Sequence, residues 1–164
     1  MKKICILLLL PLLLCSCANK NAVEPKLSGI SFVAEISYFN EKYTLECAMS
    51  EEKELVSKVI LPETLEGFTL KVNTEGVSAE YLGITYTPTD GNMPFSSVME
   101  EFYQRLSSVE TAKEIKKRDN GYDVSFGEGA SKTLLRVTEA GLPISIKMPD
   151  ERFMAEFYNV TILK

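Results

Sequence analysis

ISFVAEISYFNEKYTLECAM, residues 30–49, is the stretch that decides the fold of this 164-residue chain. Apolar side chains occupy every second position from Ile30 to Tyr38, and the alternation resumes from Tyr43 to Met49 after a short polar turn. Successive side chains of a strand point to opposite faces, so a period of two places all the apolar ones on one side. The stretch therefore predicts a β-hairpin with one buried face.

The same alternation, interrupted by turn residues, continues along most of the chain. Further strands are expected at residues 55–61, 67–72, 80–86, 111–118, 122–126, 132–138, 142–148 and 152–163. The Asn120-Gly121 pair is a strong signal for a tight hairpin turn. In the last strand the apolar phase slips between Phe157 and Tyr158, which indicates a β-bulge. The sequence thus predicts about nine or ten antiparallel strands.

Residues 94–108 have helical spacing instead. The apolar stripe consists of Phe95, Val98, Met99, Phe102 and Leu106, and the polar face of Glu100, Glu101, Gln104 and Arg105. Pro94 stands in the first turn, where its missing N–H costs little. We predict one amphipathic helix with its stripe against the sheet. The fold class is mainly β (α+β): an antiparallel incomplete β-barrel, or strongly curved sheet, with one helix packed in its concave face.

Composition and charge exclude several classes of protein. The chain is 45% hydrophobic and 25% charged, which suits a single domain with a core. It contains no histidine, so it lacks Ser-His-Asp and Cys-His catalytic groups and His-containing zinc sites. A net charge of −5 argues against nucleic-acid binding. Asp90-Gly91-Asn92 lacks the other ligands of a calcium loop, so a turn is the better interpretation. We expect no enzyme activity, metal or cofactor.

The N-terminus has the layout of a bacterial secretory signal. The cationic Met1-Lys2-Lys3 precedes an apolar run over residues 4–14, and the small Ser16 stands directly before Cys17. The apolar run is too short for a membrane-spanning helix of ~20 residues. These features predict a cleaved signal peptide.

The tetrapeptide Leu14-Cys15-Ser16-Cys17 resembles the lipobox of bacterial lipoproteins, in which an aliphatic residue, a tolerant position and a small residue precede the lipidated cysteine. The resemblance implies lipid attachment at Cys17 through a diacylglyceryl thioether, with cleavage after Ser16. Cys15 is a competing candidate, but Leu14 stands before it where the pattern requires Gly, Ala or Ser. A plain cleaved signal with an incidental cysteine is the alternative.

Three regions follow from this interpretation: a signal peptide at residues 1–16, a lipidated N-terminus and tether at 17–27, and a single β domain at 28–164. Loss of residues 1–16, which hold two lysines and no acid, changes the net charge from −5 to −7. That charge does not attract an anionic bilayer, so the lipid on Cys17 is the expected anchor. We expect a lipid-anchored monomer in a bacterial cell membrane or outer membrane, facing the extracytoplasmic side.

Cys47 is the remaining cysteine of the mature chain. Once Cys17 carries lipid, Cys47 has no partner for an intramolecular disulfide. It occupies an apolar position of the alternating run, which predicts a buried and unreactive thiol.

The arrangement resembles the lipoprotein-carrier superfamily (LolA/LolB-like, shared with RseB) over roughly residues 28–163. The matching features are the paired opening strands, the strand ended by Pro62, the Tyr81-Leu82-Gly83 strand, the single helix and the Gly141-Leu142-Pro143 corner. The family holds acyl chains or lipopeptides in a half-open barrel. Two features depart from it: no helix precedes the first strand, and the strand arginine of the soluble carriers has no identifiable counterpart.

A half barrel of this size has more concave surface than one helix covers, so the sequence predicts an apolar pocket. Its candidate residues are Phe32, Ile36, Leu45, Met99, Phe102 and Phe157. Ordinary core packing is the alternative for each. Two functions stay open: a non-catalytic binder of an apolar, acyl-chain or lipoprotein-like ligand, and a structural or sensory lipoprotein that contacts another envelope protein.

Replacement of Cys17 by serine should release the protein from the membrane, because the thioether cannot form. Cell fractionation and immunoblotting measure the change. Mass spectrometry of the native protein should find an N-terminal peptide that begins at Cys17 and carries acyl groups. A native peptide beginning unmodified at Ala18 or later would contradict the expectation.

Overall fold

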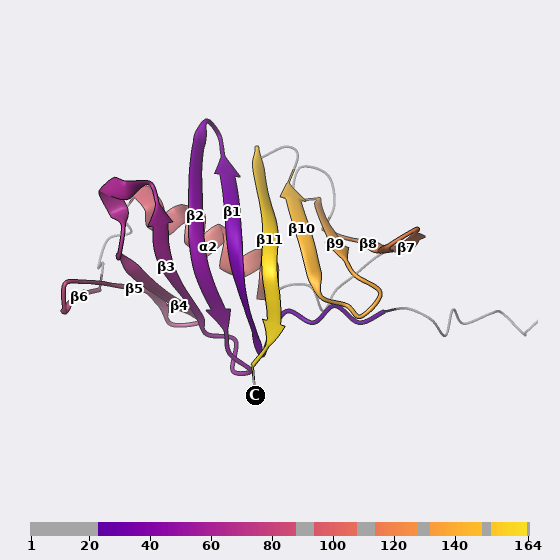
Figure 1. Cartoon of the computed structure of the whole chain (residues 1–164), viewed down its shortest axis with the longest axis horizontal. Helices are drawn as coiled ribbons and strands as arrows, with labels where there is room; N and C mark the ends of the chain where they lie inside the picture. The colour runs from indigo at the N-terminus through magenta and orange to yellow at the C-terminus, as the bar shows by residue number, and fades with distance from the viewer. Residues whose placement is uncertain (1–22, 88–93, 108–113, 128–131, 149–151, 164) are drawn as a thin grey trace, which may run out of the picture.

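The computed structural model describes residues 23–87, 94–107, 114–127, 132–148 and 152–163. In this part of the chain eleven strands form one antiparallel sheet, in the order β6-β5-β4-β3-β2-β1-β11-β10-β9-β8-β7. The sheet is strongly curved and does not close, and the helix α2 lies behind it in Figure 1, in the concave face. The predicted fold class, an incomplete antiparallel barrel with one helix in its concave face, is confirmed.

The first and last strands of the chain occupy the middle of the sheet. The first six strands are β1 (Ile30–Tyr38), β2 (Glu41–Met49), β3 (Leu55–Leu61), β4 (Thr69–Asn73), β5 (Gly76–Tyr81) and β6 (Ile84–Tyr86). The others are β7 (Glu114–Arg118), β8 (Gly121–Phe126), β9 (Thr133–Val137), β10 (Pro143–Met148) and β11 (Phe153–Ile162). A 3-10 turn, η2 (Glu63–Leu65), separates β3 from β4.

The opening hairpin forms as predicted, with Ile30 opposite Met49 and Ala34 opposite Leu45. Alternate residues of β1 are buried, and so are alternate residues of β2 from Tyr43 onward. β1 also pairs with β11 along its whole length. The two halves of the sheet are therefore joined through β1.

Two predictions about strands need correction. The expected strand 80–86 is two strands, because Leu82 and Gly83 have φ angles of 51° and 79° and turn the chain between β5 and β6. β5 also begins at Gly76, earlier than predicted. The described residues thus form eleven strands, where nine or ten were predicted for the chain.

The predicted bulge in the last strand is present, slightly beyond the expected position. Val33 pairs with Tyr158 and Ser31 with Thr161, so β11 holds one extra residue between these pairs. Asn159, with φ of 53°, lies within this interval. The bulge ends the apolar alternation of the strand, and the side chains that follow are mostly exposed.

The helix α2 (Pro94–Ser107) presents its predicted stripe to the sheet. The buried side chains are Val98, Met99, Phe102, Tyr103 and Leu106. Glu100 and Gln104 are exposed, whereas Glu101 and Arg105 are partly covered and form an ion pair of 2.6 Å one turn apart. The side chain of Phe95 and the segment Asp90-Gly91-Asn92 lie outside the described residues.

A cluster of aromatic rings joins helix and sheet. Phe102 of α2 stacks on Phe157 of β11 with ring centroids 5.9 Å apart, and Phe32 of β1 meets the edge of Phe157 at 5.1 Å. Phe153 completes the cluster at 6.0 Å from Phe102. Close offset and edge contacts of this kind add stabilisation beyond the buried area alone.

Cys47 lies in this core, as predicted. Its thiol is 5% exposed and donates a 3.4 Å hydrogen bond to the hydroxyl of Ser57. Burial raises the pKa of the Cys47 thiol to about 12, which outweighs the opposing effect of Ser57. The thiolate is therefore suppressed at neutral pH, and with it the reactivity of this cysteine.

Replacement of Phe102 by alanine should lower the free energy of unfolding by about 3–5 kcal/mol, because its fully buried ring is shared between helix and sheet. Equilibrium urea unfolding followed by circular dichroism measures the loss. Gln104→Ala, on the exposed side of the same helix, is the matched control and should change stability by less than about 0.5 kcal/mol. A small loss for Phe102→Ala would show that α2 is a loosely held lid.

Candidate functional site

Residues 23–29, the part of the chain before β1 that the structure describes, pack against the domain. Exposure alternates along it: Val23 and Pro25 are half-buried, Glu24 and Lys26 are exposed, and Leu27 is buried. The backbone N–H of Lys26 donates a 2.8 Å hydrogen bond to the carbonyl of Gly141, in the turn between β9 and β10. We call residues 23–28 the strap, since they cross one end of the sheet (Figure 1).

Gly141 makes the close approach of the strap possible. Its φ is +85°, a left-handed conformation that side chains rarely adopt. A Cβ atom at this position would collide with the carbonyl oxygen of Glu24. Position 141 thus requires glycine for two reasons: the left-handed turn and the close contact with the carbonyl of Glu24.

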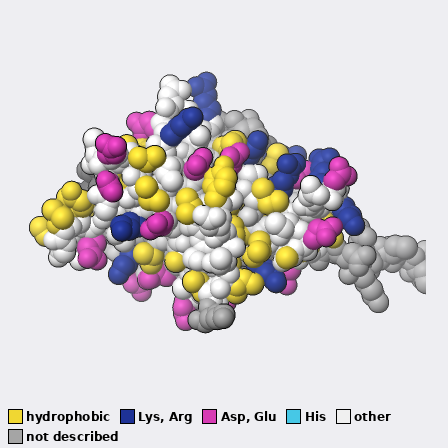
Figure 2. All heavy atoms as spheres, in the orientation of Figure 1, with side chains coloured by type: hydrophobic (Ala, Val, Ile, Leu, Met, Phe, Trp, Pro, Cys, Tyr) yellow, Lys and Arg dark blue, Asp and Glu magenta, His cyan; other side chains and the backbone are white. Residues whose placement is uncertain are grey.

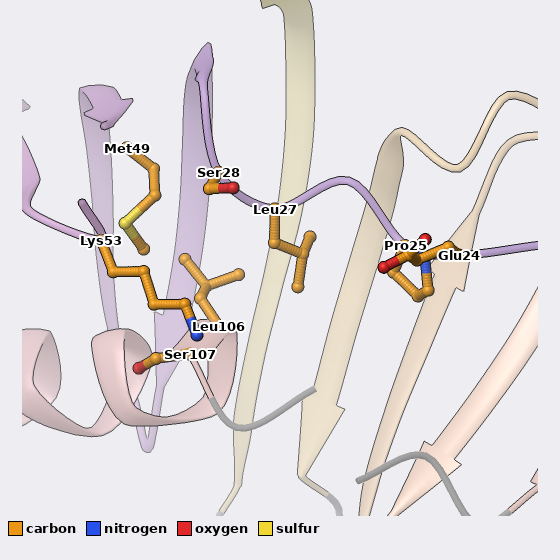
Figure 3. A pocket seen from close by; sticks show the side chains of 8 residues that line it. All are labelled: Glu24, Pro25, Leu27, Ser28, Met49, Lys53, Leu106 and Ser107. Atoms are coloured by element: carbon orange, nitrogen blue, oxygen red, sulfur yellow. The ribbon is translucent and has the colours of Figure 1, made fainter. Parts of the chain in front are cut away.

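A pocket of about 160 Å³ opens beneath the strap (Figure 3). Its walls come from the strap, from the β2–β3 connection and from the last turn of α2. The lining residues are Glu24, Pro25, Leu27, Ser28, Met49, Lys53, Leu106 and Ser107. A second hollow of about 370 Å³ lies along the same strap and shares four of these residues, Glu24, Pro25, Leu27 and Ser28.

Local structure holds the wall opposite the strap in place. Lys53 has a φ of 62° in the turn after β2, and its backbone N–H bonds to the carbonyl of Ser50 at 3.1 Å. The hydroxyl of Ser50 also accepts the N–H of Glu54 at 3.0 Å. On the helix, Ser107 donates its hydroxyl to the carbonyl of Tyr103 at 2.5 Å.

The lining of the pocket is mixed: four polar residues, Glu24, Ser28, Lys53 and Ser107, stand beside four apolar ones. Leu27, Met49 and Leu106 are almost fully buried around it. In Figure 3 the side chain of Lys53 runs past Leu106, and Glu24 lies on the opposite side. An apolar cavity of ~150 Å³ can accommodate benzene. The pocket therefore has room for the end of an acyl chain, and a whole chain needs more space.

Ionisable groups elsewhere form pairs on the sheet surface. Arg136 and Arg118 both bond to Asp123, at 3.0 and 2.6 Å, and lower the pKa of its carboxyl. Tyr43 and Tyr158 donate to Glu41 and Glu156 respectively. The pKa of each phenol rises to about 12; burial is the main cause at Tyr43 and the glutamate bond at Tyr158. No group of metal-binding side chains occurs among the described residues.

The six predicted pocket residues come together, but in the core and not around the pocket of Figure 3. Phe32, Ile36, Leu45, Met99, Phe102 and Phe157 are all buried, with Phe157 the most exposed at 7%. Whether any of them meets a ligand stays a prediction. Cys17 lies outside the described residues.

Sequence reasoning missed the pocket because its wall belongs to the segment assigned to the tether. A signal was present there: Val23, Pro25 and Leu27 alternate with Glu24 and Lys26, which is the same period of two that marks the strands.

Comparisons with known proteins add the following. No protein-family model and no curated protein matches this chain. Two solved structures are similar to it in outline. A LolA superfamily protein from Nitrosomonas europaea shares 6% identity at a TM-score of 0.45, over 88% of this chain and 90% of its own. A DUF1329 family protein from Desulfovibrio piger shares 10% identity at a TM-score of 0.39, over 82% and 86%.

Among the described residues, α2 is the one α-helix, and neither its length nor its composition would let it cross a bilayer.

Replacement of Gly141 by alanine should detach the strap. Hydrogen exchange read by mass spectrometry should show the Lys26 amide exchanging at least about tenfold faster, since its acceptor turn is displaced. Gly67→Ala is the matched control, because Gly67 has a similar φ of +80° but nothing within 4 Å of an added Cβ. Equal acceleration at Lys26 in both variants would mean that the contact with Glu24 does not matter.

Proposed function

We propose that this protein is a membrane-anchored, non-catalytic binder of an apolar ligand with an acyl chain, such as a lipid or a lipoprotein. The observation that carries the proposal is the pocket beneath the strap, which is lined by Leu27 of the strap and Leu106 of α2. The apolar part of the wall, which Leu27, Met49 and Leu106 form, favours an apolar occupant over water by roughly 25 cal/mol per Å².

The strap supports the proposal because it can serve as a cover. It is held by the burial of Leu27, by the bond from Lys26 to Gly141 and by a 3.3 Å contact from Ser28 to Glu51. A buried leucine and one hydrogen bond together stabilise the closed position by about 2–4 kcal/mol. Lifting the strap is thus far easier than unfolding the domain, and it would join the hollows along its two sides.

The position of the strap also fits the predicted anchor. Val23 lies six residues after Cys17, a distance of at most ~21 Å when extended. A lipid on Cys17 would keep the pocket close to the bilayer, which is the source of acyl chains. The net charge of −7 after signal cleavage leaves selectivity to the apolar tail.

A second function is favoured by a different observation. The interface between α2 and the sheet is filled by aromatic rings, while Leu82 and Ile84 at one end of the molecule are 84% and 73% exposed. A filled core with an exposed apolar strip is typical of a protein that contacts another protein. This supports the structural or sensory alternative.

A bulky side chain in the pocket should separate the two functions. Ser107→Phe should weaken binding of a dansyl-labelled fatty acid at least about tenfold, equivalent to about 1.4 kcal/mol, in a fluorescence titration. Gln104→Phe adds the same bulk on the exposed side of α2 and should leave binding unchanged.

Residues 18–164, expressed without the signal peptide and Cys17, should yield co-purifying acyl lipid when the purified protein is extracted with solvent and the extract is read by mass spectrometry. If no lipid is extracted and the probe does not bind at micromolar concentration, the ligand-binding proposal fails and the protein-contact alternative takes its place.

A further inference from the structure

The two edges of the open sheet differ in chemistry. β7, at one edge, carries Glu114, Lys116, Lys117 and Arg118, and all four are exposed. Charged side chains, lysine above all, are a common protection of edge strands against pairing with another chain. β6, at the other edge, has the uncharged sequence Ile84-Thr85-Tyr86. Within the described residues, charged side chains therefore protect the β7 edge and not the β6 edge.

The unprotected edge is also apolar. Tyr81, Leu82, Ile84 and Tyr86 are 46%, 84%, 73% and 55% exposed. Figure 2 shows hydrophobic side chains gathered at the left end of the molecule, where Figure 1 places β6. Leu82 is in addition held at φ 51°, a conformation that is unfavourable for leucine. Neither solubility nor turn formation accounts for these residues.

Among the described residues, β6 has a partner strand on one side only, and this leaves the main-chain groups of one residue without a partner strand. Tyr81 of β5 and Ile84 of β6 flank the two-residue turn and pair with each other. The N–H and C=O groups of Ile84 therefore point toward β5. In an antiparallel ladder this orientation alternates along the strand. The N–H and C=O of Thr85 consequently point away from β5, toward the open edge.

We propose that a second copy of this chain adds its β6 antiparallel to the first, about a two-fold axis through Thr85. Thr85 would exchange both main-chain hydrogen bonds with Thr85 of the other copy. Ile84 would lie opposite Tyr86 on each side of the axis, and pairs of an aromatic with a β-branched residue stabilise sheets. The edge is thus complementary to itself, which a two-fold interface requires.

Charge does not oppose this arrangement. The charged side chain of the hairpin nearest to the edge is Glu80, which pairs with Thr85 on β5. In the dimer the two copies of Glu80 would be three strand spacings apart, about 14 Å. That exceeds the screening length of ~10 Å at 0.1 M salt.

The area sets the strength of the association. Ile84 and Tyr86 of the two copies, exposing on the order of 100 Å² each, would bury roughly 400 Å² in a dimer, far below the 1,200–2,000 Å² of stable interfaces. The free domain should therefore dimerise weakly. Confinement to a membrane raises the effective concentration and should populate the dimer.

Disulfide trapping on the full chain in cell membranes tests the proposal. Thr85→Cys places two thiols at a Cα separation of ~5.5 Å, within disulfide range. Copper-phenanthroline oxidation should give a covalent homodimer on a non-reducing gel, at least about tenfold above the wild type, whose Cys47 is buried. Lys116→Cys on the opposite edge is the matched control and should stay near the wild-type level.

A lysine in the edge should prevent trapping. Ile84→Lys in the Thr85→Cys background should abolish the homodimer, whereas Thr74→Lys, which adds the same charge at the exposed β4–β5 turn, should not. A monomeric Thr85→Cys protein, equal trapping at positions 85 and 116, or an adduct with a different protein in place of the homodimer would overturn the proposal.

Discussion

The pairing of β1 with both β2 and β11 is the constraint on which the rest of the structure depends. It places the first and last strands, β1 and β11, in the middle of the sheet, so the free edges must come from the middle of the sequence. β6 and β7 are those edges, and α2 lies between them along the chain. A helix of 14 residues spans about 21 Å. The topology thus requires the chain to cross from one edge to the other, and the apolar stripe of α2 directs that crossing through the concave face.

Most of the fold could be predicted because its signals are local. The alternation in residues 30–49, the three-to-four spacing from Val98 to Leu106 and the slipped phase after Phe157 each depend on neighbours in sequence. The turn at Leu82-Gly83 was missed although it leaves a local signal: the apolar phase shifts from odd positions, Val77 to Tyr81, to even ones, Leu82 to Tyr86. Leucine is a poor turn residue, and its presence at φ 51° hides that signal. The turn forms because β6 pairs back on β5, an interaction that composition does not reveal.

The candidate site was harder to predict than the fold, for a related reason. Phe32, Phe102 and Phe157 are among the aromatic residues that suggested a pocket. Their rings pack against one another and fill the helix–sheet interface. The hollow lies instead where Leu27 meets Leu106, between segments almost eighty residues apart in sequence. The strap that forms one wall of this hollow is bound at Gly141, and a backbone contact between residues so distant in the chain has no signature in local periodicity.

If the protein is anchored as proposed, the docked strap would also determine the distance between the domain and the bilayer. With an anchor at Cys17, as proposed, and the strap docked, six residues connect the anchor to Val23. When extended they span at most ~21 Å. If the strap detaches as far as Ile30, the connecting segment grows to thirteen residues, which span at most ~45 Å. Undocking of the strap would thus do two things at once: it would expose the pocket, and it would let the domain move farther from the membrane. A pull on the domain away from the membrane would favour the undocked strap, so the spacing between the membrane and any partner would itself act on the pocket.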